Sequence, residues 1–262
     1  MSQTTGTKKS TRAIAFGIDI GGSGIKGAPV NLARGEFSAD RVRIPTPEVS
    51  TPGAVAEVVA RLVASFDLPP DVPVGVTFPA VVQHGVARSA ANVDSSWIGT
   101  NIETVLGNAL GRRVSAFNDA DAAGYGEATY GAARGSAGVT LITTLGTGIG
   151  TAMVVDGVLV PNLELGHIEI DGRDAESLAS EGARDRDNLS WDAWAKRLQR
   201  YYGVLEDLLW PDLIVVGGGV SKNHARFLPL LHLRAPIVPA QLRNAAGIVG
   251  AAALAARAGQ AR

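Results

Sequence analysis

The apolar positions of the chain follow two alternating periods, which predict strands and helices in turn. Short apolar runs bounded by glycine or proline predict strands in the first half, over residues 13–20, 25–30, 36–44, 72–78 and 113–117. Apolar residues at helical spacing predict helices over residues 51–66 and 101–110. Val81 to Ala87 should form a hairpin that turns at His84-Gly85. The first half is therefore expected to be a mixed α/β unit.

The second half restarts the same order of elements. Strands are expected over residues 139–144, 151–155 and 158–160, then a helix over 190–209, a strand over 213–216 and a helix over 244–256. Each half contains a strand–glycine turn–strand unit, which reads Asp19-Ile-Gly-Gly-Ser-Gly-Ile in the first and Thr144-Leu-Gly-Thr-Gly-Ile-Gly in the second. This match predicts an internal duplication, with two domains facing a central cleft and one glycine turn on each wall.

The domain boundaries follow from this repeat. Residues 1–12 are polar and are expected to be a disordered tail. Residues 13–116 should form a small N-terminal α/β domain, which the C-terminal helix at 244–257 completes. Residues 117–243 should form a larger C-terminal α/β domain.

Composition narrows the classes of partner. The chain has 262 residues, of which 46% are hydrophobic, and a formal net charge of −1, so no global field favours nucleic acid or an anionic membrane. The absence of cysteine excludes disulfides and thiolate metal sites. No apolar run approaches the roughly 20 residues that span a bilayer, and residues 1–12 lack the apolar core of a secretory signal. We expect a cytoplasmic protein with no nucleic-acid or membrane partner.

The first glycine turn has the composition of a phosphate site. Its backbone N–H groups can approach an anion, and the carboxylate of Asp19 beside them calls for a Mg²⁺ ion or a water between it and a phosphate. The candidate phosphate-binding residues of this turn are Gly21, Gly22, Ser23, Gly24 and Lys26. An ordinary hairpin turn would explain one such turn alone. A dinucleotide-binding motif is rejected, because Pro29 and a strand follow where a helix should begin.

Two further stretches carry candidate chemistry. Asn118 and Asp119 end a strand and start a helix; capping alone would explain them, and the functional alternative is that Asp119 accepts a proton from a substrate hydroxyl in the cleft. Glu164-Leu-Gly-His167 offers acceptors and a donor in a short loop, which suits a polyhydroxylated ligand. A metal site and an ordinary surface loop are the alternatives. The glycines at 217–219 follow a buried strand, where ligand contact is expected.

Taken together, these motifs resemble those of the ROK family of sugar kinases. They are, in order, Asp19-Ile-Gly-Gly-Ser, Asn118-Asp119-Ala120, Leu-Gly-Thr-Gly-Ile-Gly at 145–150, Glu164-Leu-Gly-His167 and Gly-Gly-Gly-Val at 217–220. The resemblance runs from Ala13 to Arg257 and implies a duplicated actin/hexokinase-like (RNase H-like) α/β fold. The segment from Glu164 to Ser180 looks like the branch of the family that uses polyphosphate or ATP to phosphorylate glucose.

The resemblance also implies roles for individual residues. The reaction would move a terminal phosphoryl group to the 6-hydroxyl of glucose, and of mannose as a second sugar, with Asp119 as general base and Mg²⁺ near Asp19. Sugar contacts would come from Asn92, Asn118, Glu164, His167 and Glu176. Phosphate contacts would come from Asp19 and Gly22 and from Thr147 and Gly148, and adenosine contacts from Gly218 and Gly219. A homodimer is the expectation for the family.

One departure and several questions remain at the level of sequence. Many family members carry a zinc-binding cysteine cluster after the matching histidine; residues 169–183 contain no cysteine, so we expect no zinc and another means of ordering His167. A polyphosphate path needs basic residues, for which the candidates are Lys26, Arg134, Lys196, Arg197, Arg200, Lys222 and Arg226, although a solvated surface would explain most of them. The alternative functions are an ATP-only kinase of another hexose, an actin-like ATPase or scaffold, and a non-catalytic sugar sensor.

Overall fold

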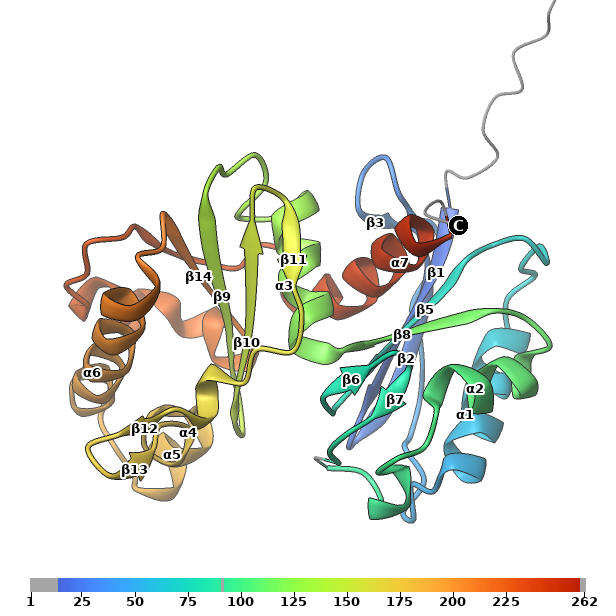
Figure 1. Ribbon diagram of the computed structural model, residues 1–262, viewed down its shortest axis with the longest axis horizontal. Coiled ribbons are helices and arrows are strands. Elements are labelled where there is room, and N and C mark those ends of the chain that lie inside the picture. The colour runs from blue at the N-terminus through green and yellow to red at the C-terminus, as the bar shows by residue number, and fades with distance from the viewer. Residues whose placement is uncertain (1–13, 91, 260–262) are drawn as a thin grey trace, which may run out of the picture.

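The computed structural model describes residues 14–90 and 92–259. Its two large sheets have the helices α3 and α7 between them (Figure 1). The expected tail at residues 1–12, and the first residue of the expected strand at 13–20, lie outside the described residues. Within the described ranges, no helix is both long and apolar enough to cross a lipid bilayer.

The first sheet has the strand order β3-β2-β1-β5-β8, with β4 also pairing with β2. The antiparallel hairpin β1 (Ile14–Gly21) and β2 (Gly24–Asn31) is followed by β5 (Val74–Phe78) and β8 (Val114–Asn118), which are parallel to β1. The alternating residues of β1 divide between two cores. Phe16, Ile18 and Ile20 pack with α1 (Pro52–Ala64) and α2 (Ile102–Leu110), and Ala15 packs with α7 (Ala246–Ala258) on the other face.

The second sheet repeats this plan with the order β11-β10-β9-β14-β15. Here the hairpin is β9 (Val139–Leu145) and β10 (Ile149–Val155), and β14 (Leu213–Gly217) runs parallel to β9 as β5 does to β1. The remaining strands are β11 (Val158–Val160) and β15 (Ile237–Pro239). The long helix α6 (Trp191–Leu209) covers one face, and α3 (Asp119–Tyr130) covers the other. The expected duplication is therefore confirmed by the pairing of the strands.

Short elements complete the chain. The hairpin β6 (Val82–Gln83) and β7 (Val86–Ala87) turns at His84 and Gly85, both with positive φ, as expected. The others are the hairpin β12 (Glu169–Ile170) and β13 (Arg173–Asp174), the helices α4 (Glu176–Ala179) and α5 (Glu181–Arg186), and the 3₁₀ helices η1 (Ser95–Trp97), η2 (Leu165–His167), η3 (Gly219–Arg226), η4 (Leu228–Leu230) and η5 (Arg243–Ala245).

Several expected strand boundaries were wrong; β5, for example, begins at Val74 and not at residue 72. The expected strand at 36–44 is two strands, β3 (Glu36–Phe37) and β4 (Val42–Ile44), which pair with different parts of β2. Val30 lies opposite Phe37 while Gly27 lies opposite Val42, so extra residues bulge out of the ladder between them. In the second glycine turn, pairing of Ile149 with Leu145 starts the returning strand at 149 instead of 151, because glycine does not stop the ladder.

Glycines allow α3 and α7 to cross closely. A Cβ atom at Gly250 would collide with the backbone of Ala122, and one at Gly126 would lie 2.7 Å from the carbonyl oxygen of Ala246. On its other side α7 presses on the first sheet, where a Cβ at Gly17 would collide with the backbone of Ile248. The C-terminal helix thus packs on the N-terminal strands. The division into domains at residues 116 and 243 stays a prediction.

We predict that Gly250→Ala lowers the free energy of unfolding by about 3 kcal/mol, at the upper end of what overpacking costs, since the new Cβ would overlap backbone that cannot move aside. The matched control is Gly203→Ala within α6, where a Cβ would meet nothing within 4 Å. That substitution should raise stability by about 0.5–1 kcal/mol through helix propensity. Urea unfolding followed by circular dichroism measures both, and equal effects would contradict the close crossing.

Candidate active site

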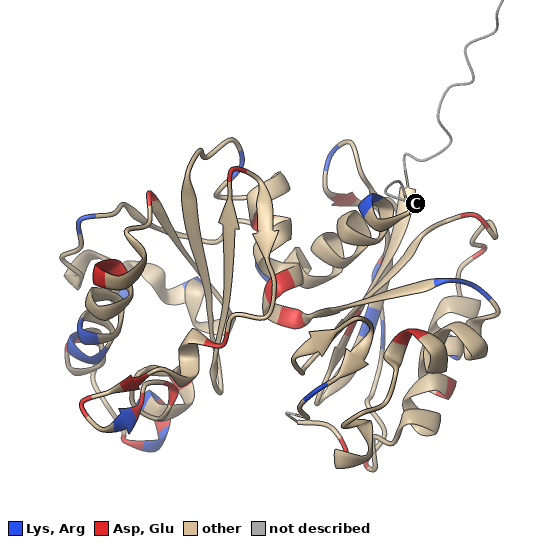
Figure 2. Cartoon of the chain, viewed as in Figure 1, with Lys and Arg blue, Asp and Glu red and all other residues tan. Residues whose placement is uncertain are grey.

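A cavity of about 640 Å³ opens between the two halves and is lined by most of the expected site residues. These are Asn92, Asn118, Asp119, Thr147, Gly148, Glu164, His167, Glu176 and Gly218. A second cavity of about 200 Å³ shares Asp119, Ala120, Thr144 and Gly218 with the first, and adds Asp19, Lys26 and Arg243. The expected sugar residues and two of the expected phosphate residues, Asp19 and Lys26, therefore meet at Asp119. The remaining candidates line neither cavity: Gly21, Gly22, Ser23, Gly24 and Gly219. Acidic positions gather at the N-terminal turn of α3, where the halves meet (Figure 2).

Asp119 lies at the junction of β8 and α3, and its neighbour performs the capping. The side-chain oxygen of Asn118 accepts a hydrogen bond from Asp121 N–H at 3.0 Å, so Asn118 is the N-cap of α3. Asp119 accepts from Ala120 N–H at 2.9 Å, and its side chain is exposed to the cavity. Protein atoms surround Asp119 at the base of the cleft and partly remove its carboxylate from water. This desolvation, together with the negative charges of Asp19 and Glu164, raises the pKa of Asp119 to about 6.

Asn118 also makes a hydrogen bond to the segment that follows β5. Its side-chain nitrogen donates to the carbonyl oxygen of Ala80 at 3.0 Å, so both ends of the amide are engaged by the protein. One hydrogen of that nitrogen remains for a ligand, because an amide nitrogen has two donors. The capping interpretation of Asn118 is confirmed, and its contact with a sugar stays a prediction.

Asp121 and Asn162 form a link that sequence reasoning missed. Asp121 is buried, and it accepts from Asn162 N–H at 2.7 Å, while its other oxygen has no hydrogen-bond partner in the described part of the chain. Desolvation raises the pKa of Asp121 to about 7. The Asn162 side chain in turn accepts from Val82 N–H and donates to Val82 O, each at 2.9 Å. The loop that carries Glu164 is thereby fixed to α3 and to the β6–β7 hairpin of the other half.

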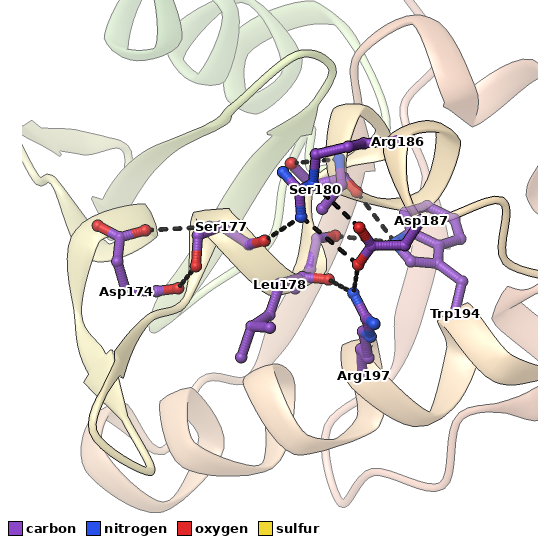
Figure 3. A network of polar contacts seen from close by, with 10 residues as sticks. Asp174, Ser177, Leu178, Ser180, Arg186, Asp187, Trp194 and Arg197 are labelled. Atoms are coloured by element: carbon purple, nitrogen blue, oxygen red, sulfur yellow. Dashed lines mark hydrogen bonds and ion pairs between the residues drawn. The ribbon is translucent and has the colours of Figure 1, made fainter.

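Asp174 orders His167. Its carboxylate lies 2.9 Å from Nδ1 of His167. Its other oxygen accepts from Ser177 N–H at 3.0 Å (Figure 3). The hydrogen bond to Asp174 is the largest cause that raises the pKa of His167 above its ordinary value of 6.5. Burial alone would raise the pKa of Asp174, but the bonds from His167 and Ser177 together lower it. With Nδ1 held in this way, Nε2 is left for a ligand.

The segment that carries Asp174 is anchored to α6. Arg186 donates to the carbonyl oxygen of Ser177 at 2.7 Å and to Asp187 at 3.0 Å. Asp187 accepts from Arg197 of α6 at 2.7 Å, and the Trp194 indole donates to Ala179 O at 3.0 Å (Figure 3). This network positions the β12–β13 hairpin and α4 without sulfur ligands.

Glu176 supports the second glycine turn. Its carboxylate accepts from Ile149 N–H at 2.7 Å, and a Cβ at Gly148 would overlap the same carboxylate. Gly146 N–H donates to Gly148 O at 3.0 Å, which closes the turn. Among the described residues, the amides of Thr147 and Gly148 have no acceptor, so both can donate to an anion in the cavity.

Two residues outside the expected set, Thr77 and Arg43, help to hold the first glycine turn. Asp19 accepts from Lys26 Nζ at 3.2 Å and from the buried Thr77 hydroxyl at 2.9 Å, and Arg43 donates to the carbonyl oxygen of Ser23 at 2.6 Å. None of the glycines at 21, 22 and 24 has positive φ, so their backbone angles do not explain why glycine occurs here. At Gly24 glycine is required for space, because a Cβ there would lie 2.6 Å from the Arg43 guanidinium.

The donor atoms of this turn fit a Mg²⁺ ion held through water. Asp19 is the carboxylate beside the turn, and within the described residues no group of three or more His, Cys, Asp or Glu residues could hold a metal ion. Mg²⁺ is commonly bound by one or two carboxylates together with waters and substrate phosphates, which is the arrangement that Asp19 allows.

Gly218 and Gly219 differ in their surroundings. Gly218 has a φ of 81°, and a Cβ there would overlap the backbone of Leu145, so both conformation and packing require glycine. A Cβ at Gly219 would meet only Glu181, at 3.7 Å. Contact of these glycines with adenosine stays a prediction.

Most of the basic residues considered for a polyphosphate path lie elsewhere. Arg197 pairs with Asp187 at 2.7 Å, Arg200 pairs with Asp171 at 2.7 Å, and Arg226 lies over the Trp191 ring. Of the seven candidates, Lys26 alone lines either of the two cavities described above.

Comparison with known proteins shows the family to which the chain belongs. The family model described as "ROK family" matches residues 15–184. The chain belongs to the ROK family. It is 47% identical to the polyphosphate glucokinase of Mycobacterium tuberculosis (strain CDC 1551 / Oshkosh) over 252 residues, which cover 96% of this chain and 94% of that protein. The chain is also 46% identical to the polyphosphate glucokinase of Mycobacterium leprae (strain TN), and this match covers 96% of this chain and 76% of that protein.

Solved structures of ROK proteins share the fold. The inorganic polyphosphate/ATP-glucomannokinase from Arthrobacter sp. strain KM has a TM-score of 0.87 and 56% identity, covering 94% of this chain and 99% of that chain. A ROK family glucokinase from Streptomyces griseus, in complex with glucose and AMPPNP, has a TM-score of 0.79 and 24% identity. The match covers 93% of this chain and 99% of that chain, and at this identity it supports the fold alone. The expected actin/hexokinase-like fold is thus confirmed.

We predict that Asp174→Asn lowers the pKa of His167 toward 6.5, because the substitution removes the charged acceptor that favours the imidazolium. NMR titration of the His167 ring protons measures the change, with the signal assigned through His167→Gln. Asp171→Asn is the control, since Asp171 lies in the same hairpin but pairs with Arg200. An unchanged titration curve in Asp174→Asn would show that the pair does not order the ring.

Proposed function

We propose that this ROK protein transfers the terminal phosphoryl group of polyphosphate or ATP to the 6-hydroxyl of glucose. The observation that carries the proposal is the position of Asp119, between a cavity lined by Glu164, His167 and Glu176 and a second cavity lined by Asp19 and Lys26. Its 47% identity to a polyphosphate glucokinase supports both the sugar and the donor.

The sugar site in this proposal is the larger cavity. Glu164, His167 and Glu176 come from the loop between β11 and β12 and from the start of α4, and Asn92 faces them from the other half beside Gly22. Carboxylates accept from sugar hydroxyls and the imidazole can donate, which gives a hexose the mixed partners that it needs. An actin-like ATPase or scaffold would not need this set.

The chemical step is a displacement at phosphorus. The bond from the terminal phosphorus to the bridging oxygen breaks as the bond to the sugar O6 forms, and the shortened donor leaves with the bridging oxygen. Asp119 accepts the hydroxyl proton, which its raised pKa favours over an ordinary aspartate. The free amides of both glycine turns hold the phosphoryl oxygens, and holding the reactants in line contributes roughly 7–11 kcal/mol.

Asp19 would hold Mg²⁺ through water in this proposal, and the ion would supply positive charge that offsets the developing charge on the phosphoryl oxygens. Lys26 keeps the Asp19 carboxylate oriented toward the smaller cavity. The proposal includes no zinc site.

Three finer properties belong to the same proposal. Mannose is a second sugar, supported by the Arthrobacter glucomannokinase at 56% identity. A homodimer and a cytoplasmic location are carried over from the family. The use of mannose is tested by a panel of hexoses against ATP and polyphosphate, scored for hexose 6-phosphate. The same panel separates this enzyme from an ATP-only kinase or a non-catalytic sugar sensor. Sedimentation equilibrium tests the homodimer.

Replacing the proposed base should leave binding intact and remove turnover. We predict that Asp119→Asn lowers kcat by about 10²–10⁴-fold, the usual contribution of a general base, while calorimetry still detects glucose binding. Asp67→Asn, at an exposed position after α1, is the control and should keep full turnover. Near wild-type turnover in Asp119→Asn would contradict the role of the carboxylate, whatever donor is used.

The acid limb of the pH profile should report Asp119. A base with a pKa of about 6 is protonated as pH falls through that value, so kcat/KM should decline about tenfold for each pH unit below it. The measurement is initial rates from pH 5 to 8 with each donor in turn. A kcat/KM that stays constant down to pH 5 with both donors would contradict a raised pKa of Asp119 as the limit on activity.

A further inference from the structure

Charged residues of three neighbouring strands form a row on one face of the first sheet. Asp19 of β1 lies opposite Lys26 of β2, and Lys26 lies opposite Arg43 of β4, so their side chains project from the same face. The alternating residues Ile25 and Ile44 pack into the core under α1 on the opposite face. The row therefore faces away from α1, on the side of the smaller cavity, which Asp19 and Lys26 line.

Two more arginines extend this row. Arg41 lies just before β4, and it donates to the carbonyl oxygen of Asn244 at 3.4 Å, which places it beside the start of α7. The next residue toward the N-terminus, Arg243, lines the smaller cavity. Arg43 reaches toward the first glycine turn, where its guanidinium donates to Ser23 O at 2.6 Å. The basic groups thus run from the turn to the start of α7.

These arginines lack acidic partners, in contrast to those of the second half. No ion pair involves Arg41, Arg43 or Arg243 within residues 14–90 and 92–259, and all three are exposed. The arginines near α5 and α6 are paired with carboxylates, including those at 184, 186, 197, 200 and 234. A solvated surface explains exposed charge, but it does not explain a guanidinium fixed to the carbonyl of a phosphate-binding turn.

The geometry of transfer directs the donor toward this row. The attacking and leaving oxygens lie roughly in line through the phosphorus. In the proposed function the sugar occupies the larger cavity, and the smaller one shares Asp119 and Thr144 with it but contains none of Glu164, His167 and Glu176. The leaving part of the donor therefore extends into the smaller cavity, toward Lys26 and Arg243.

We propose that Arg41, Arg43 and Arg243 bind the part of a long polyphosphate donor that lies beyond its reacting end. This inference rests on the proposed function and assigns a site to one of its two donors. Polyphosphate repeats a negative charge along its whole length, so a row of planar guanidinium groups can follow it by charge-assisted hydrogen bonds. ATP carries charge on three phosphates only, and so gains less from the outer arginines.

The test compares donors of different length in one double variant, Arg41→Gln with Arg43→Gln, and in Arg243→Gln. We expect kcat/KM with long polyphosphate to fall about tenfold for each lost contact, or 1.4 kcal/mol, and to fall much less with tripolyphosphate or ATP. The salt dependence of the long-chain rate should also become shallower. Arg61→Gln, on α1 at the opposite face of the sheet, is the matched control.

The outcomes separate this inference from the proposed function. A wild-type protein that phosphorylates glucose with neither donor overturns both. A wild-type protein active with polyphosphate, whose double variant keeps the same ratio of long-chain to ATP-driven activity, overturns the arginine row alone, as does a wild-type protein that uses only ATP. Compared with Arg43→Gln, Arg43→Lys should recover part of the rate with long polyphosphate, because it keeps the positive charge but loses the planar guanidinium group. No recovery would indicate a purely structural role for Arg43.

Discussion

The close crossing of α3 and α7 determines where the chemically active groups of this protein lie. Both helices begin at the base of the cleft, α3 at Asp119 and α7 at Ala246. A Cβ at Gly247 would lie 3.9 Å from the Asp19 carboxylate, so the start of α7 is next to the first strand. Because the helices approach through glycine at 126 and 250, no side chain separates them. A wider crossing would move Asp119 away from Asp19.

The sugar side of the cleft is ordered by hydrogen bonds between carboxylates and their neighbours. Asp174 holds both His167 and the start of α4, and Glu176 from that helix holds the second glycine turn. Each of these acids contacts a backbone amide or an imidazole, so one helix start couples the proposed sugar site to the proposed phosphate site. In a partly desolvated cleft such bonds are stronger than in water, and an unmatched member would be costly.

Charge divides the cleft into two sides. Asp119 and Glu164 lie in the larger cavity, where desolvation raises the pKa of each. The smaller cavity holds the basic side chains of Lys26 and Arg243, beside the carboxylates of Asp19 and Glu127. A neutral polyol suits the acidic side because its hydroxyls donate to carboxylates, and a polyanion suits the basic side. The difference gives each substrate a preferred place before any reaction occurs.

The sequence by itself determined the repeated strand–turn–strand plan and the position of Asp119 after a strand, since apolar runs, glycine turns and helix caps are local signals. It also determined the family, through short motifs in a fixed order. Only the tertiary structure decided that Asp174 orders His167, that Asn162 links the halves to Asp121, and that Arg43 lies over the first turn. These contacts join residues by strand register and helix packing, which no local pattern encodes. The same reason explains why the close approach of Arg43 to Gly24, and of Glu176 to Gly148, could not be predicted from the sequence.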